Sequence, residues 1–139
     1  MSGNLEATQR IFAIWNTRDF EALIPFLTED IEWAPATMAA VEGGSFHGTE
    51  GMRQFFDEWD KAWAKWEVET SEMKELGDRV LVLGRVHAEG RGSGMVLDQD
   101  VGYVFRFRDG LLAWGSTYFD QDEARAAAAE GAREEGATA

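Results

Sequence analysis

The sequence predicts an α+β fold in which a curved antiparallel sheet wraps around three N-terminal helices. Two patterns predict it: the first half of the chain spaces its apolar residues as helices do, and the second half alternates apolar with polar residues as strands do. The length of 139 residues fits a single domain. We assign that domain to residues 1–131, because the Ala-rich end of the chain decays into a Gly- and Glu-bearing stretch that predicts a flexible acidic tail over 132–139.

The helices of the first half follow from their apolar positions. The pattern over 5–15 predicts a helix with one broad apolar face, and Asp19 fits the N-cap of a short second helix that runs through Phe26. Thr49 opens the strongest helical pattern. The apolar residues at helical spacing in this third helix are Met52, Phe55, Phe56, Trp59, Trp63 and Trp66.

The strands follow from alternation. A short strand is expected at 31–33, and four long strands are expected over 68–76, 79–89, 101–107 and 111–119. The first long strand is expected to contain a bulge, because Val68 and Thr70 fall out of phase with Met73. Asp109-Gly110 predicts a tight hairpin between the last two strands, and a final helix begins at Asp120.

Composition excludes several classes of partner and site. The 13 Lys and Arg against 26 Asp and Glu give a formal net charge of −13, which repels nucleic-acid phosphates and anionic membrane surfaces. The chain has no Cys and only two His, far apart in the sequence, so no metal site is expected. The start of the chain does not resemble a signal peptide and no apolar run is long enough to span a membrane, which predicts a soluble cytoplasmic protein.

Several short motifs resemble the SnoaL-like family of the nuclear transport factor 2-like superfamily. They are WNTRDFEAL (15–23), LTEDIEW (27–33), FHGTEGMRQFF (46–56), LGDRVLVLGRV (76–86), FRFRDGLL (105–112) and YFDQDEA (118–124). The resemblance implies a cone-shaped roll with an apolar cavity between sheet and helices, and a homodimer formed through the outer face of the sheet. It does not fix a reaction, because the superfamily includes isomerases, dehydratases, polyketide cyclases, epoxide hydrolases and members without known catalysis.

The ketosteroid isomerase branch implies an Asp base, a Tyr and a strand Asp at defined positions. In this sequence Ala34 or Pro35 stands at the base, Ile11 at the tyrosine and Tyr103 at the strand acid, so that mechanism is disfavoured, although Tyr103 still offers a hydroxyl to a carbonyl oxygen. The epoxide hydrolase branch is disfavoured as well, because Arg85 and Arg106 alternate with core residues and are expected to point outward.

A cyclase-like mechanism needs an acid or base in an aromatic cavity, and the candidates are Asp120 and His47, together with Tyr103. Asp120 follows Trp114, Ser116 and Tyr118, which we expect to face the cavity. Two of these candidates have a plainer interpretation: Asp120 fits the N-cap of a capping box with Glu123, and His47 fits a solvent-facing loop.

The aromatic residues are the strongest indication of a ligand, since the chain has six Trp and nine Phe but only two Tyr. The residues expected to form the cavity wall are Trp15, Trp33, Met38, Phe55, Trp59, Tyr103, Trp114 and Tyr118. Core packing alone is the alternative interpretation of this set. Buried indole N–H and phenol O–H groups need partners, so such a wall suits a flat ligand with a few oxygens.

The sequence therefore predicts a protein that binds a small apolar molecule, with or without cofactor-independent proton-transfer chemistry such as aldol cyclisation, isomerisation or dehydration. The alternative is a non-catalytic binding or dimerisation module. The expected dimer interface is the outward row Leu81, Leu83, Arg85 and His87.

Overall fold

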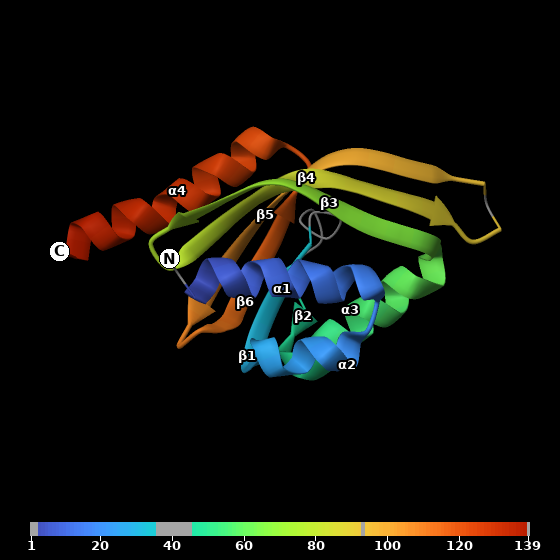
Figure 1. Ribbon diagram of the computed structural model, residues 1–139, viewed down its shortest axis with the longest axis horizontal. Coiled ribbons are helices and arrows are strands. Elements are labelled where there is room, and N and C mark those ends of the chain that lie inside the picture. Colours follow the sequence, from blue (N-terminus) through green and yellow to red (C-terminus); the bar gives the residue numbers. More distant parts are fainter. Residues whose placement is uncertain (1–2, 36–45, 93, 139) are drawn as a thin grey trace.

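The computed structural model describes residues 3–35, 46–92 and 94–138, with side chains through residue 130 (Figure 1). Its elements are α1 (Gly3–Thr17), α2 (Phe20–Leu23), the 3₁₀ turn η1 (Ile24–Phe26), β1 (Leu27–Ala34), β2 (Phe46–His47), α3 (Gly48–Ala62), β3 (Trp63–Leu76), β4 (Arg79–Gly90), β5 (Val96–Arg108), β6 (Leu111–Tyr118) and α4 (Gln121–Thr138). None of the described helices is long and apolar enough to span a bilayer.

The sheet has six strands in the order β2-β1-β6-β5-β4-β3. It is mixed rather than wholly antiparallel, because β1 runs parallel to β6 while every other neighbouring pair is antiparallel. The parallel pair arises because α3 and the β3–β5 meander separate β1 from β6 along the chain. The predicted α+β class, with a curved sheet around helices, is confirmed.

The three N-terminal helices lie on one side of the sheet and α4 lies on the other (Figure 1). α1 buries Ile11, Phe12 and Trp15. Asp19 caps α2 as predicted, since its Oδ1 accepts from the Ala22 N–H at 3.3 Å. The short helix then tightens into η1 at Pro25.

The third helix is shorter than its pattern predicted. α3 ends at Ala62, and Trp63 already has the extended backbone of β3. Trp63 and Trp66 therefore lie on a strand and not on the helix. The physical reason is that Trp66 and Val68 are buried while Lys65 and Glu67 are exposed, so period-two burial already governs this stretch.

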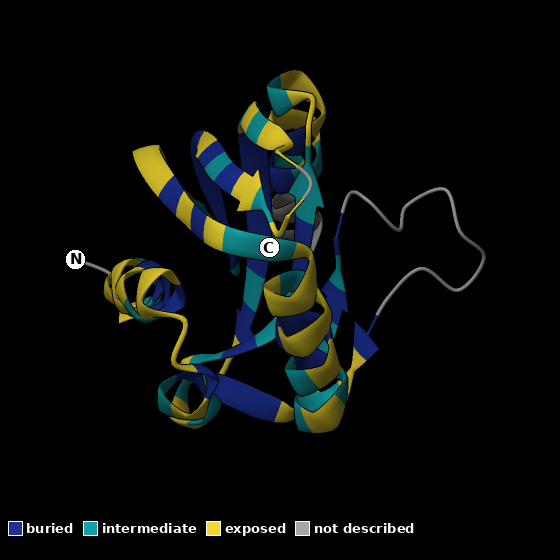
Figure 2. Cartoon of the chain, turned by 90° about the vertical axis from the view of Figure 1, so that its right-hand side faces the viewer, coloured by how far each residue is buried: buried dark blue, intermediate teal, exposed yellow. Residues whose placement is uncertain are grey.

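The predicted alternation of β4 and β5 is present, but it sorts their side chains between two cores, whereas the outward phase was expected at a dimer interface. Val80, Val82, Val86 and Ala88 join the large core between sheet and helices, together with the β5 residues Val101, Tyr103, Phe105 and Phe107. Leu81, Leu83 and Val104 face the other way and form a second cluster beneath α4. Figure 2 shows the buried residues concentrated on the middle of the sheet, with exposed residues on the outer sides of the helices.

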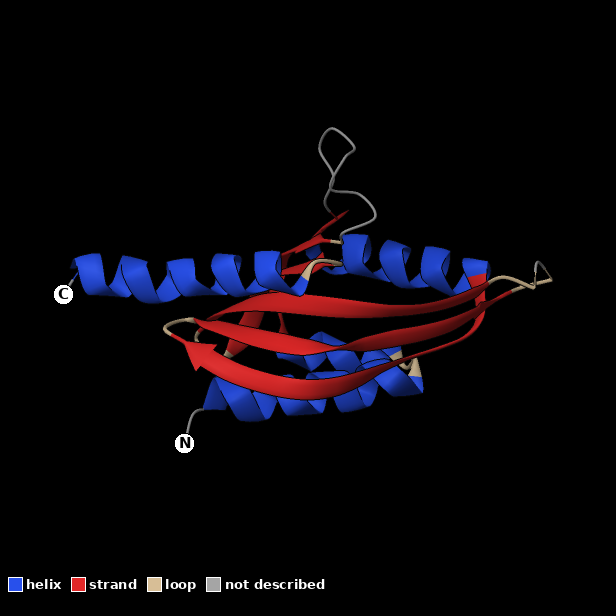
Figure 3. Ribbon diagram, turned by 90° about the horizontal axis from the view of Figure 1, so that it is seen from above, coloured by secondary structure: helices blue, strands red, loops and turns tan. Residues whose placement is uncertain are grey.

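Close backbone contact attaches α4 to the sheet. A Cβ added to Gly102 would lie 2.4 Å from the Ala124 Cβ, so only glycine lets the helix approach β5 this closely. The buried Arg79 side chain donates from Nη1 to the Ala127 carbonyl at 2.7 Å. α4 continues past Ala129, and the division between 1–131 and 132–139 stays a prediction. Both chain ends lie at the same end of the molecule (Figure 3).

Candidate ligand-binding cavity

A cavity lies between α1, α3 and the inner face of the sheet. Its lining residues are Trp15, Trp33, Pro35, Phe55, Trp59, Trp66, Val68, Val86, Val101, Tyr103, Thr117 and Phe119. Its volume is about 50 Å³. Cavities that hold drug-sized ligands measure roughly 300–1,000 Å³, so this one suits a compact ligand in the present arrangement of side chains.

Five of the eight residues expected in the cavity wall line it: Trp15, Trp33, Phe55, Trp59 and Tyr103. They form a continuous aromatic layer. The Trp33 ring centroid lies 5.3 Å from that of Trp15 and 5.6 Å from that of Phe55, and Phe55 stacks on Trp59 at 6.0 Å. These tilted and stacked contacts hold the rings in fixed orientations, which favours a preformed site.

Trp33 lies over a glycine of the neighbouring strand. A Cβ added to Gly115 would come within 2.6 Å of the Trp33 Cζ3 atom and 2.7 Å of Cε3, so the missing side chain makes room for the indole. Trp33 is only 1% exposed, and its Nε1 has no hydrogen-bond partner. The cavity therefore has a buried donor in its wall whose hydrogen-bonding capacity is unused.

Tyr103 is the one predicted catalytic residue that lines the cavity. Its ring meets the Phe12 ring edge-on at 4.9 Å and lies 6.5 Å from the Trp33 ring. Burial raises the pKa of the Tyr103 phenol above its ordinary value, because ionisation would place a charge in an apolar environment. Tyr103 is thus a neutral hydroxyl that can donate a hydrogen bond, and it is a poor base.

A bulge reverses the expected direction of the Trp114 side chain. β5 and β6 pair Phe107 with Leu112, and then Arg106 with Trp114, so Ala113 is an extra residue in β6. Regular pairing would have placed Trp114 opposite Phe105 and on the cavity face. The bulge turns Trp114 to the outer face, where it packs on the cluster beneath α4.

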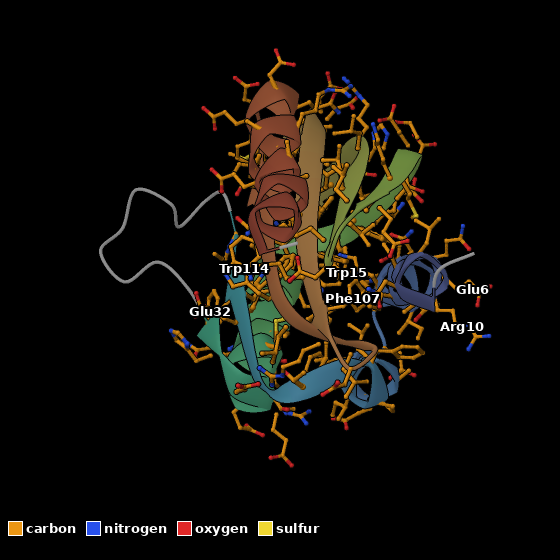
Figure 4. The ribbon with its side chains drawn as sticks, turned by 90° about the vertical axis from the view of Figure 1, so that its left-hand side faces the viewer. Glu6, Arg10, Trp15, Glu32, Phe107 and Trp114 are labelled. Carbon is orange, nitrogen blue, oxygen red and sulfur yellow. The ribbon has the colours of Figure 1, made fainter. Side chains whose placement is uncertain are left out.

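Tyr118 follows Trp114 in phase and also packs on the outer cluster. Figure 4 shows Trp114 on the side of Glu32, with Trp15 and Phe107 on the side of α1. The expectation that Trp114 and Tyr118 face the cavity is therefore wrong, and Thr117 and Phe119 line it instead.

Asp120 lies outside the cavity lining and caps α4. Its Oδ1 accepts from the N–H of Asp122 at 2.9 Å and from that of Glu123 at 3.4 Å. The side chain is exposed. This is the geometry of the plainer, capping interpretation.

His47 lies at the start of α3 and pairs across the strands with Glu32. Its Nδ1 is 3.7 Å from the Glu32 Oε1, and its side chain is 68% exposed. His47 is not among the residues that line the cavity. Met38, the remaining predicted wall residue, lies outside the described residues.

The described part of the cavity lining is uncharged. Among its described residues there is no Asp, Glu, His, Lys or Arg. In the described part of the chain, no three His, Cys, Asp or Glu side chains come together as a metal site would require. The arrangement can bury apolar surface and donate hydrogen bonds, but the described lining supplies no carboxylate or imidazole for proton abstraction.

Sequence reasoning missed Trp66 as a lining residue because Trp59, Trp63 and Trp66 together have helical spacing. The signal that could have found it is the alternation of Trp66 and Val68 with charged residues. The Trp66 Nε1 donates to Asp60 at 3.3 Å, which distinguishes it from Trp33. Sequence reasoning also missed Thr117 and Phe119 as lining residues, because the bulge at Ala113 turns them toward the cavity and the sequence carries no signal for that bulge.

Solved structures share this fold. A nuclear transport factor 2-like protein of unknown function from Burkholderia pseudomallei is 23% identical, with 88% of this chain and 95% of that chain covered and a TM-score of 0.77. TerC co-crystallised with polyporic acid is 25% identical, with 93% and 99% covered and a TM-score of 0.74. A putative SnoaL-like polyketide cyclase from a Jannaschia species is 19% identical, with 91% and 92% covered and a TM-score of 0.74.

A comparison with curated proteins finds no match. The family described as the SnoaL-like domain matches residues 8–114, which run from within α1 to the middle of β6 and exclude α4. The matched segment, the six-stranded curved sheet and the helices around its inner face agree with one another. The chain therefore belongs to the SnoaL-like family.

Proposed function

We propose that this protein binds a small, largely apolar molecule in the aromatic cavity. The observation that carries the proposal is the uncharged lining of Trp, Phe and Tyr rings between the helices and the sheet. Burial of a ligand against such rings yields about 25 cal/mol per Å² of apolar surface, and fixed rings reduce the ordering cost of binding. TerC, which is similar to this chain over nearly its whole length, was crystallised with polyporic acid, which supports a ligand site in this fold.

The cavity lining favours binding without turnover. Aldol cyclisation, isomerisation and dehydration each need a base near the reacting carbon, and the described lining provides none. Asp120 and His47 have capping and surface surroundings, so a catalytic role for either residue is the weaker proposal. Tyr103 contributes a hydroxyl that can orient a ligand oxygen.

A homodimer through the outer sheet face stays a second proposal. Leu81 and Leu83 of the expected interface are only 2% and 3% exposed, because α4 of the same chain covers them. The remaining part of the row is charged: Arg85 contacts Asp98 and Asp100, and His87 lies within 3.2 Å of Glu69 and Asp98. Sedimentation at micromolar concentration tests it, and a monomer contradicts it.

Ligand binding is tested by filling the cavity. Val101 and Val96 both lie on β5, but Val101 is 2% exposed and lines the cavity whereas Val96 is 70% exposed. We expect Val101→Phe to weaken binding of aromatic ketones by about tenfold or more, because loss of roughly 1.4 kcal/mol is tenfold in Kd. Val96→Phe is the matched control and should leave Kd unchanged. Intrinsic Trp fluorescence gives the titration, and equal affinities for the two variants would contradict the proposal.

A further inference from the structure

The unused donor of Trp33 distinguishes it within the cavity. Buried polar groups nearly always have a hydrogen-bond partner, and an exception requires an explanation. Trp66 lines the same cavity and follows the rule, since its Nε1 donates to Asp60. The Trp33 Nε1 has no hydrogen-bond partner even though the residue is almost fully buried, at 1% exposure.

The direction of the Trp33 ring is fixed by Gly115. The Cε3 and Cζ3 atoms of the indole lie directly over that glycine, against the sheet. In an indole, Nε1 belongs to the opposite long edge of the ring. The N–H edge therefore lies on the side of the ring away from Gly115, and Trp33 is among the residues that line the cavity.

A second neutral donor lies nearby. The Tyr103 ring is 6.5 Å from the Trp33 ring and nearly parallel to it, at 25°. Both side chains line the cavity. Burial keeps the pKa of the Tyr103 phenol above its ordinary value, so the hydroxyl keeps its proton. The described lining thus offers a ligand oxygen the Trp33 N–H and the Tyr103 O–H as donors, and it carries no charged side chain.

The same lining disfavours charged ligands. A buried carboxylate needs a cationic partner, and none is present among the described lining residues. The net charge of −13 adds long-range repulsion of anions. A cation has no acceptor atom to offer, so it would leave the Trp33 N–H unpaired.

We propose that the ligand is a compact, uncharged aromatic ketone or aldehyde whose carbonyl oxygen accepts a hydrogen bond from the Trp33 Nε1–H. This inference rests on the proposed function and adds the ligand's chemical class and its anchoring residue. The small cavity disfavours ligands larger than a single ring, and the unpaired donor favours an acceptor oxygen.

Three ligands of similar size and one smaller cation separate these requirements: acetophenone has the carbonyl, ethylbenzene lacks it, benzoate is anionic, and tetramethylammonium is cationic. Calorimetry gives Kd for each ligand with the unmodified protein and with Trp33→Phe. We expect Trp33→Phe to weaken acetophenone binding by about 2- to 12-fold more than ethylbenzene binding, the factor that corresponds to one net hydrogen bond. Trp63→Phe is the matched control, because Trp63 is half-buried and does not line the cavity.

The outcomes separate this inference from the proposed function. Failure of all four ligands to bind the unmodified protein contradicts the proposed function itself. An equal effect of Trp33→Phe on acetophenone and ethylbenzene overturns only the hydrogen bond, and tighter binding of benzoate or tetramethylammonium overturns the uncharged ligand class. If Trp33→Phe does not fold, the indole N–H resonance of Trp33 in the unmodified protein decides: it should move downfield with acetophenone and not with ethylbenzene, and identical shifts refute the proposal.

Discussion

Gly115→Ala is expected to destabilise the protein and to weaken ligand binding through one contact. The added Cβ would lie 2.6 Å and 2.7 Å from two Trp33 ring carbons and 3.3 Å from the Phe105 Cδ1. Ordinary carbon contacts begin at about 3.5 Å, so Trp33 must move by about 1 Å. Overpacking of this kind costs about 1–3 kcal/mol, and replacement of a strand glycine offsets about 0.5–1 kcal/mol.

The net expectation is a loss of about 1 kcal/mol, which lowers the Tm by about 3–5 °C for a chain of this size. Circular dichroism melts measure the stability, and acetophenone titration measures the cavity. Gly102→Ala is the matched control: its Cβ would lie 2.4 Å from the Ala124 Cβ, on the opposite face, so it should lower the Tm without changing Kd. A Gly115→Ala variant with unchanged Tm and unchanged Kd would refute the placement of Trp33 over the glycine.

Three further predictions concern the Asn16 side chain, the Asp120 cap of α4 and the Tyr103 phenol. Asn16→Ala should destabilise the protein by about 1–3 kcal/mol in urea unfolding, because the side chain donates to the Val68 carbonyl at 2.9 Å and accepts from its N–H at 2.8 Å; Asn16→Asp keeps the acceptor and should lose less, and equal losses would contradict this. Asp120→Ala should cost about 0.5–2 kcal/mol, whereas Asp120→Asn, an equally good cap, should cost almost nothing and leave Kd unchanged; weaker binding by the Asn variant would point to a role for the carboxylate. Because the pKa of the Tyr103 phenol is raised in the folded protein, this phenol ionises first in the unfolded chain, so the free energy of unfolding should fall as the pH rises above 10.0, the ordinary phenol value. Tyr103→Phe should lessen that fall. A Tyr103→Phe variant with an unchanged alkaline stability profile would contradict the burial of the phenol.

The alternation of β4 could be predicted from the sequence because both of its phases carry apolar residues, although the burial of its outward phase beneath α4 was not predicted. Valines of β4 point into the large core while Leu81 and Leu83 point to the second cluster, so each phase carries its own apolar series. The cap of α2 was predictable for a similar reason, since Asp19 acts on neighbouring N–H groups alone. Local chemistry and strict alternation are both visible in a single sequence.

The rest of the site depends on features that leave no such pattern. The spacing of Trp59, Trp63 and Trp66 fits a helix as well as a helix followed by a strand, and only pairing with β4 decides between them. The bulge at Ala113 changes which alternate residues of β6 face the cavity, because one extra residue turns every later side chain to the opposite face of the sheet. Trp114 was misplaced for this reason alone.

A crystal structure with 4-bromoacetophenone tests the central claim most directly, since anomalous scattering locates the bromine and difference density locates the ketone. We expect the ligand between the helices and the sheet, bounded by Trp15, Phe55 and Tyr103, with its oxygen within hydrogen-bonding distance of the Trp33 Nε1. A bromine on the outer face beside Trp114, or an empty interior at saturating ligand, would contradict the account.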